Sequence, residues 1–154
     1  EAEYTPPKLY YVYNKKIAST KSVLFWLGAT GNKILNESLV DVIIQEIEKI
    51  CSKYDLALGP HDEHIKGLYS KPWVKNVKTI NLDLKGIAEY YSDFKCVIIP
   101  DTGPMHLVAA LDIPLVQVFV DSNIEQYAYS GDNKYVIDNK VDIKDFSQFI
   151  KRYV

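Results

Sequence analysis

The chain has 154 residues, of which 47% are hydrophobic and 25% charged, a composition typical of one folded domain rather than of a disordered chain. Eighteen basic and twenty acidic residues give a net charge of −2, which provides no electrostatic basis for nucleic-acid binding. The apolar runs are much shorter than the roughly 20 residues of a membrane span, and the two cysteines match no disulfide framework or zinc motif.

Along the chain, residues 1–21 are predicted to be a linker or N-terminal extension, and residues 22–154 one domain. Short apolar runs predict strands at 22–27, 56–58, 77–80, 95–99, 115–120 and 135–137. Stretches of helical spacing or helix-start signals between them predict helices or helical turns at 37–54, 62–69, 83–92, 104–111, 123–129 and 143–153. Strands that alternate with helices in this way predict an α/β fold with a mostly parallel sheet.

The most informative loop is P-D-T-G-P-M-H at 100–106, which follows the most apolar strand and opens a helix. Asp101 or Thr102 can cap that helix, and Gly103 lets a ligand approach the backbone. The free amides of the first helical turn can bind an anion, with His106 one turn along as a further donor. The alternative is an ordinary capped turn in which His106 is a packed residue.

A second loop, L-G-A-T-G-N-K at 27–33, joins the first strand of the domain to a helix. Small residues can wrap around a phosphate, while Thr30 donates a hydrogen bond and Lys33 supplies a positive charge. The pattern is neither a P-loop nor a dinucleotide fingerprint, so both of those site types lack support.

A third loop, G-P-H-D-E-H at 59–64, combines histidines and carboxylates. His61 and His64 next to acidic residues leave a metal site open as an alternative, although no other cluster in the sequence completes one. Asp62 and Glu63 are better explained as the start of a helix, where acidic side chains suit the dipole, and one of them can reach a ligand hydroxyl.

The stretch P-D-T-G-P-M-H-L-V-A-A-L-D-I-P-L-V-Q-V-F at 100–119 resembles the signature of the lipopolysaccharide heptosyltransferase family, glycosyltransferase family 9. The other loops fit its order: Gly28-Ala29-Thr30 with Lys33 behind it, then a helix, then Leu58-Gly59-Pro60 followed by acidic residues. The resemblance covers roughly residues 22–125. It implies a Rossmann-like three-layer sandwich that corresponds to the C-terminal half of a two-domain GT-B enzyme.

Carried over by motif, the resemblance implies that seven residues bind a nucleotide sugar: Thr30, Lys33, Glu63, Asp101, Thr102, Gly103 and His106. Thr30 and Lys33 would contact the donor diphosphate and Glu63 the ribose hydroxyls. The remaining four would line the phosphate and the sugar. The tight spacing between Thr30 and Lys33, and Val120 where the family usually has glycine, are departures from the pattern.

The family transfers a heptose or related sugar from a nucleotide sugar, for which ADP-heptose is one candidate, to a lipopolysaccharide core acceptor with inversion. The resemblance implies no tightly bound metal and no cofactor. The acceptor surface and the catalytic base would lie in an N-terminal domain absent from this chain, so no catalytic residue is assigned here. The implied location is the cytoplasm, with peripheral contact at the inner membrane through that domain.

Two other functions stay open at this point. The chain could be a non-catalytic nucleotide-binding or interaction module that has kept the fold. It could also be a hydrolase or epimerase of nucleotide sugars, enzymes that share the GT-B fold. Product formed without an acceptor would indicate the latter, and loss of nucleotide affinity in Lys33 and His106 variants would argue against the former.

Overall fold

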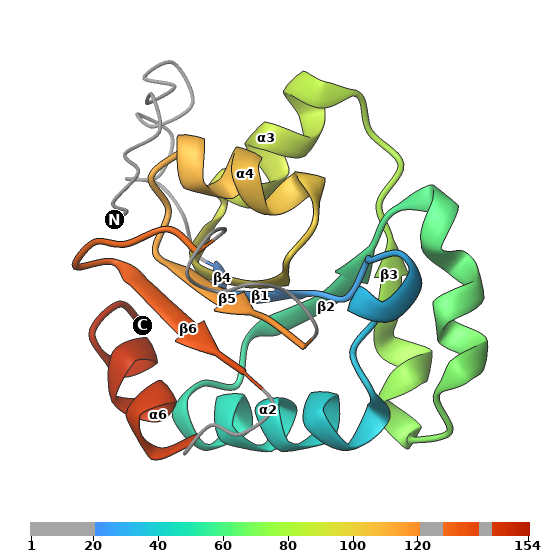
Figure 1. Ribbon diagram of the computed structural model, residues 1–154, viewed down its shortest axis with the longest axis horizontal. Coiled ribbons are helices and arrows are strands. Elements are labelled where there is room, and N and C mark those ends of the chain that lie inside the picture. Colours follow the sequence, from blue (N-terminus) through green and yellow to red (C-terminus); the bar gives the residue numbers. More distant parts are fainter. Residues whose placement is uncertain (1–20, 121–127, 139–142) are drawn as a thin grey trace.

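The computed structural model describes residues 21–120, 128–138 and 143–154. Their strands form a six-stranded sheet in the order β3-β2-β1-β4-β5-β6, in which every neighbouring pair is parallel (Figure 1). The strands are β1 (Lys21–Trp26), β2 (Tyr54–Leu58), β3 (Val77–Thr79), β4 (Phe94–Pro100), β5 (Leu115–Val118) and β6 (Lys134–Ile137). The predicted α/β fold with a parallel sheet is confirmed.

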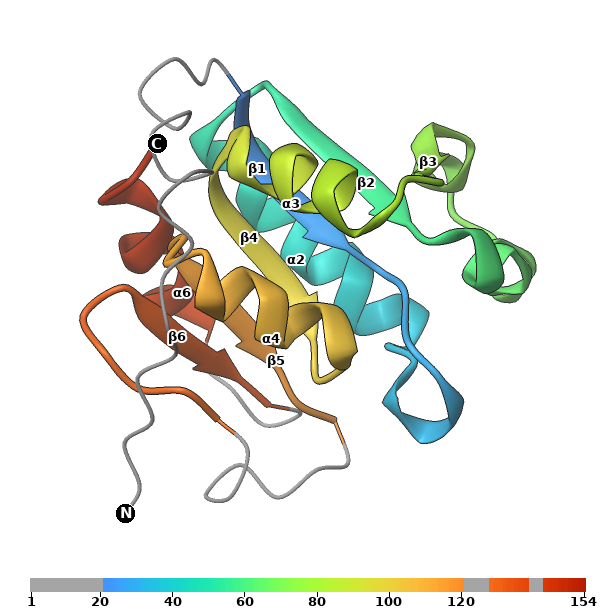
Figure 2. The same ribbon diagram turned by 90° about the horizontal axis from the view of Figure 1, so that it is seen from above.

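Helices cover both faces of this sheet, which gives three layers. One face carries α2 (Glu37–Ile50) and α6 (Ile143–Lys151), and the other carries α3 (Leu84–Ser92) and α4 (Gly103–Ala110) (Figures 1 and 2). Side chains of a strand point alternately to the two faces. Accordingly, Val23 and Phe25 of β1 pack in the core under α2, whereas Leu24 and Trp26 pack under α3 and α4. Burial on both faces explains the continuous apolar runs of the central strands.

The predicted elements differ from the observed ones chiefly at their ends. Helix α2 ends at Ile50 rather than at residue 54, because Cys51 is already extended and Tyr54 pairs with Val23 as the first residue of β2. The helix predicted at 62–69 is a 3-10 helix, η3 (Pro60–Leu68). The helical turn predicted at 123–129 lies mostly outside the described residues, as does the predicted extension at 1–21 except for its last residue.

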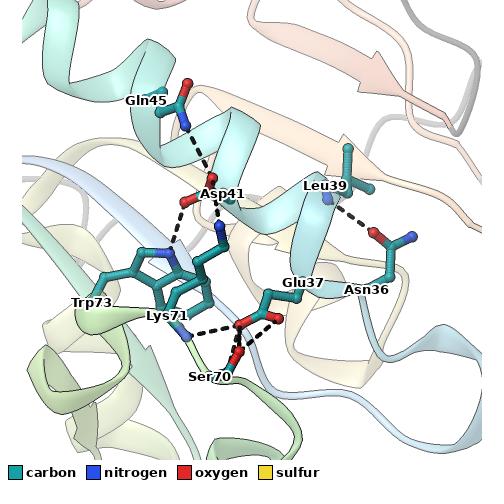
Figure 3. Close-up of polar contacts among 8 residues, drawn as sticks. All are labelled: Asn36, Glu37, Leu39, Asp41, Gln45, Ser70, Lys71 and Trp73. Atoms are coloured by element: carbon teal, nitrogen blue, oxygen red, sulfur yellow. Dashed lines mark hydrogen bonds and ion pairs between the residues drawn. The ribbon is translucent and has the colours of Figure 1, made fainter.

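The connection from β2 to β3 is tied to the start of α2 by a set of polar contacts (Figure 3). The Glu37 carboxylate accepts hydrogen bonds from the backbone amides of Ser70 (2.5 Å) and Lys71 (2.8 Å). One turn along α2, Asp41 accepts a bond from the Trp73 indole at 3.0 Å. Since η3 begins this connection, these bonds fix the base of the segment that carries Asp62 and Glu63.

None of the helices in the described part of the chain is both long and apolar enough to span a membrane.

Candidate functional site

A cavity of about 370 Å³ opens at the carboxyl edge of the sheet, on the side covered by α3 and α4. Strand order reverses between β1 and β4, and ligands of open α/β sheets bind in the crevice beyond the strand ends at such a point. The volume lies within the range of small-ligand pockets. The cavity is lined by Trp26, Gly59, Pro60, His61, Asp62, Ile80, Leu82, Leu84, Ile87, Tyr91, Gly103, Pro104 and Leu107.

Most of this lining is apolar, and part of it is open to solvent. Leu82, in the connection from β3 to α3, and Leu84, the first residue of α3, are 53% and 73% exposed. Deeper in the wall, the rings of Trp26 and Tyr91 meet edge to face with centroids 5.3 Å apart. The cavity can therefore take a flat apolar group between an exposed leucine rim and an aromatic wall.

One carboxylate, that of Asp62, lines the cavity. Its Oδ2 accepts a hydrogen bond from the Gly59 amide at 3.2 Å, which caps η3. The same oxygen would lie 2.4 Å from a Cβ built on Gly28, and the Trp26 indole nitrogen would lie 2.8 Å from it. Gly28 therefore has to be a glycine because a side chain there would displace both the indole and the carboxylate.

Glu63, the acidic residue assigned to the ribose from the resemblance, is placed differently. It is exposed, is not among the cavity residues, and bonds to the Thr79 hydroxyl and to Lys66. The Thr79 hydrogen bond, helped by Lys66, lowers the pKa of the Glu63 carboxyl below its ordinary value. Adjacent side chains of a helix point in different directions, and the structure brings Asp62 rather than Glu63 to the cavity.

The structure brings two other expected residues together from distant loops. Lys33 Nζ lies 2.9 Å from Asp101 Oδ2, and the Asp101 side chain is only 7% exposed, against 36% for the Lys33 side chain. This ion pair connects the loop after β1 to the loop after β4, so Asp101 holds its loop in place. Thr30, at the N-cap of η2 (Gly31–Lys33), is exposed and makes no side-chain capping bond.

The start of α4 offers backbone amides that its side chains do not cap. Thr102 occupies the N-cap position, but it makes no capping bond, and its buried Oγ1 has no hydrogen-bond partner among the residues that the structure describes. The sequence-based expectation that Asp101 or Thr102 caps this helix is therefore wrong for Thr102 and unsupported for Asp101, whose recorded side-chain bond goes to Lys33. Uncapped amides at a helix N-terminus are a favourable place for an anion.

Gly103 and His106 both lie in the first turn and a half of α4. A Cβ built on Gly103 would meet no atom within 4 Å, and its φ is not in the left-handed region, so the fold itself does not require glycine here. His106 is exposed, and its Nδ1 is in hydrogen-bond contact with the hydroxyl of Tyr129, which is 8% exposed.

Several features of the site were not identified from the sequence. No sequence pattern assigned the cavity residues Trp26, Leu82, Leu84 and Tyr91 to a site. Whether such apolar side chains line a cavity or fill a core depends on contacts between elements that are distant in the sequence, so no local signal marks them. Among the described residues, no group of three or more histidine, cysteine, aspartate or glutamate side chains is arranged to hold a metal ion.

The sequence of residues 75–149 matches the model of glycosyltransferase family 9 (heptosyltransferase). This match confirms the resemblance to family 9. The matched stretch contains β3, α3, β4, α4 and the loop at 100–106, that is, one wall of the cavity and the uncapped helix start. No curated protein sequence matches the chain.

Solved structures of heptosyltransferases share the fold. E. coli heptosyltransferase WaaC with ADP aligns over 98% of this chain and 51% of its own, with a TM-score of 0.69 and 21% identity. E. coli ADP-heptose lps heptosyltransferase II aligns over 94% of this chain and 50% of its own, with a TM-score of 0.58 and 15% identity. The family 9 glycosyl transferase from Veillonella parvula aligns over 100% of this chain and 47% of its own, with a TM-score of 0.59 and 14% identity. This chain thus spans about half the length of the family 9 structures that it matches.

Proposed function

We propose that this chain is the donor-binding half of a family 9 glycosyltransferase and that it binds a nucleotide sugar at the carboxyl edge of its sheet. The observation that carries the proposal is the cavity at the point where strand order reverses, which runs up to the first residues of an uncapped helix. A flat apolar chamber next to an anion-binding helix start suits a nucleoside joined to a diphosphate.

In this proposal the nucleoside occupies the cavity. Its base lies among Leu82, Leu84 and Leu107, and the Asp62 carboxylate accepts hydrogen bonds from the sugar hydroxyls or from the edge of the base. The absence of a side chain at Gly103, where one would fit, leaves room for the ligand to pass from the cavity to the helix start.

The diphosphate would lie at the α4 N-terminus, within reach of Lys33 and His106. These groups and the backbone amides supply the positive charge that a leaving nucleoside diphosphate needs, and we propose that no metal is required for binding. Because Lys33 already pairs with Asp101, a phosphate has to share or displace that bond. Titrations in EDTA and in magnesium should then give the same affinity.

The proposed reaction is inverting transfer of a heptose or related sugar to a lipopolysaccharide core acceptor. E. coli WaaC is described with ADP and with ADP-2-deoxy-2-fluoro heptose, which supports an ADP-linked donor for this chain as well. The acceptor surface and the base would come from an N-terminal domain in the cytoplasm at the inner membrane. The chain by itself should bind the donor and transfer nothing.

The test is a titration of the 154-residue chain with ADP, UDP, GDP and CMP, in which binding is measured from the amide chemical shifts in NMR spectra. We expect one nucleotide to move signals at residues 28–33, 59–62, 80–84 and 101–107 together. Signals that move only in one of these segments, or no response to any of the four nucleotides, would contradict the proposal. Sugar transfer by this chain alone would contradict the assignment of the base to another domain.

A second candidate function is a non-catalytic module that keeps the fold. The ion pair of Lys33 and Asp101 favours it, since the one lysine of the loop already has a partner without any ligand. In that case Lys33→Ala would lower the free energy of unfolding and leave nucleotide affinity unchanged.

A further inference from the structure

The strand β5 contains one fully buried polar side chain, Gln117, in the middle of the apolar sheet. Its amide makes two hydrogen bonds with the backbone of a single residue: Nε2 donates to the Tyr129 carbonyl at 2.9 Å, and Oε1 accepts from the Tyr129 amide at 2.6 Å. A buried amide is unfavourable unless both of its ends are satisfied. Gln117 therefore fixes the backbone of Tyr129 against β5 as a neighbouring strand would.

Tyr129 in turn contacts the exposed histidine of the candidate site. Its ring meets the His106 ring nearly perpendicularly, with centroids 5.5 Å apart, and its hydroxyl reaches Nδ1. Tyr129 is buried, so the hydroxyl comes from the protein side and leaves the opposite edge of the imidazole to the solvent side. A fixed residue thereby holds a ring that would otherwise rotate freely at the surface.

We propose that Tyr129, fixed by Gln117, is a positioning residue that sets the tautomer of His106. A tyrosine hydroxyl keeps its proton at neutral pH and can donate a hydrogen bond to the Nδ1 lone pair. The imidazole proton is then on Nε2. His106 then presents an Nε2–H donor, the form required to bind a phosphate oxygen at the start of α4. The inference rests on the proposed function for the identity of that acceptor.

The tautomer can be read directly from ¹⁵N chemical shifts of the imidazole nitrogens in the ligand-free chain. The chain has three histidines, so the His106 signals can be assigned by their loss in His106→Gln. At about pH 8 we expect the Nε2–H tautomer in the wild type. In Tyr129→Phe, which keeps the ring, the shifts should move toward a mixture of the two tautomers.

The matched control is Tyr69→Phe, which removes another buried hydroxyl. Tyr69 donates to the Leu35 carbonyl at 2.6 Å and packs in the core on the opposite face of the sheet. The Tyr69→Phe variant should destabilise the chain without moving the His106 signals. An Nδ1–H tautomer in the wild type would overturn the proposal, and so would His106 shifts in Tyr129→Phe equal to those of the wild type. The first of these outcomes needs no variant to fold.

The second readout compares ADP with adenosine. Tyr129→Phe should weaken ADP binding about three- to tenfold, the loss of roughly one hydrogen bond to a charged group, and leave adenosine binding unchanged. In a His106→Gln background the same change should have no further effect, because the two residues act as one unit. Equal ADP affinity in the wild type and Tyr129→Phe would overturn the proposal. If the wild type binds no nucleotide, the proposed function fails, while the tautomer assignment is still decided by the ¹⁵N spectrum.

Discussion

The carboxyl edge of the sheet has two halves that are organised in opposite ways. In the polar half, formed by the loops after β1 and β4, the charged and polar groups already bond to one another: Lys33 to Asp101, and His106 to Tyr129. In the cavity half, formed chiefly by the segments after β2 and β3 together with one side of α4, most of the lining is apolar and encloses about 370 Å³.

This difference indicates where binding energy can come from. A group that enters the cavity half removes apolar surface from water and breaks no existing ion pair. A phosphate in the polar half has to compete with an internal bond for Lys33, so its net gain is smaller. We therefore expect the cavity half to supply most of the affinity for a nucleotide and the polar half to supply orientation.

The strongest test of this division fills the cavity half. Gly103→Trp adds a large side chain at the cavity mouth without backbone strain, since a Cβ there meets nothing within 4 Å. Nucleotide affinity, measured by calorimetry, should fall by about a hundredfold or more, which corresponds to roughly 3 kcal/mol. Gly67→Trp is the control, because Gly67 is equally open but does not line the cavity. Equal losses in the two variants would end the assignment of the ligand to this cavity.

The ion pair of the polar half should matter more for stability than for binding. Lys33→Met leaves the nearly buried Asp101 carboxylate without its cation and should cost about 1 to 3 kcal/mol in urea unfolding. Adding Asp101→Asn removes the unpaired charge, so the double variant should recover part of this loss. A double variant as unstable as the sum of the single ones would show that the pair contributes no coupling.

The two acidic residues of η3 test whether the ligand lies in the cavity, because Asp62 lines it and Glu63 does not. Asp62→Asn, which keeps an oxygen for the Gly59 amide but loses the charge facing the cavity, should weaken nucleotide binding about three- to tenfold. Glu63→Gln should leave the affinity within about twofold, since Glu63 points to Thr79 and Lys66 instead. The reverse order would restore the role that the family resemblance implies for Glu63.

The smallest expected effect on stability comes from removing the hydroxyl of Tyr91. Tyr91 lines the cavity half with its side chain fully buried, and its hydroxyl makes no hydrogen bond within the described part of the chain, so Tyr91→Phe should be neutral or stabilise the chain by about 1 kcal/mol. A clear loss of stability would mean that this hydroxyl does have a partner.

The Tyr91→Phe variant should also change how the free energy of unfolding depends on pH. Burial raises the pKa of Tyr91 above its ordinary value, whereas in the unfolded chain it ionises near pH 10. The stability linked to Tyr91 is therefore complete below about pH 10 and is lost as the pH rises further. Tyr91→Phe should lose less stability than the wild type over that alkaline range, measured by urea unfolding at each pH.

The sequence was sufficient for the fold because its signals are local. A short apolar run rich in β-branched residues, such as Cys96 to Pro100, favours a strand buried on both faces, and the spacing of Val40, Ile43, Ile44 and Ile47 defines the buried side of α2. Alternation of such elements then restricts the topology to right-handed parallel crossovers.

The site was less predictable because its contacts join distant parts of the chain. Nothing near Lys33 in the sequence indicates that its partner is Asp101, and nothing near Gln117 indicates that it holds Tyr129. The carboxylate that lines the cavity belongs to Asp62, whereas the motif resemblance points to its neighbour Glu63. Adjacent side chains of a helix point in different directions, and a motif alone does not determine which of the two faces a cavity.

The central strand β1 has a consequence for how the chain folds. It forms ladders on both sides, with Val23 opposite Tyr54 of β2 and opposite Cys96 of β4. Parallel pairs of this kind close long loops before they gain any contacts, which makes folding slow relative to helical bundles. Until β4 has been synthesised, β1 offers an apolar edge to any other strand. Pairing with β4 is therefore the step that protects the second edge of β1 from association with other chains.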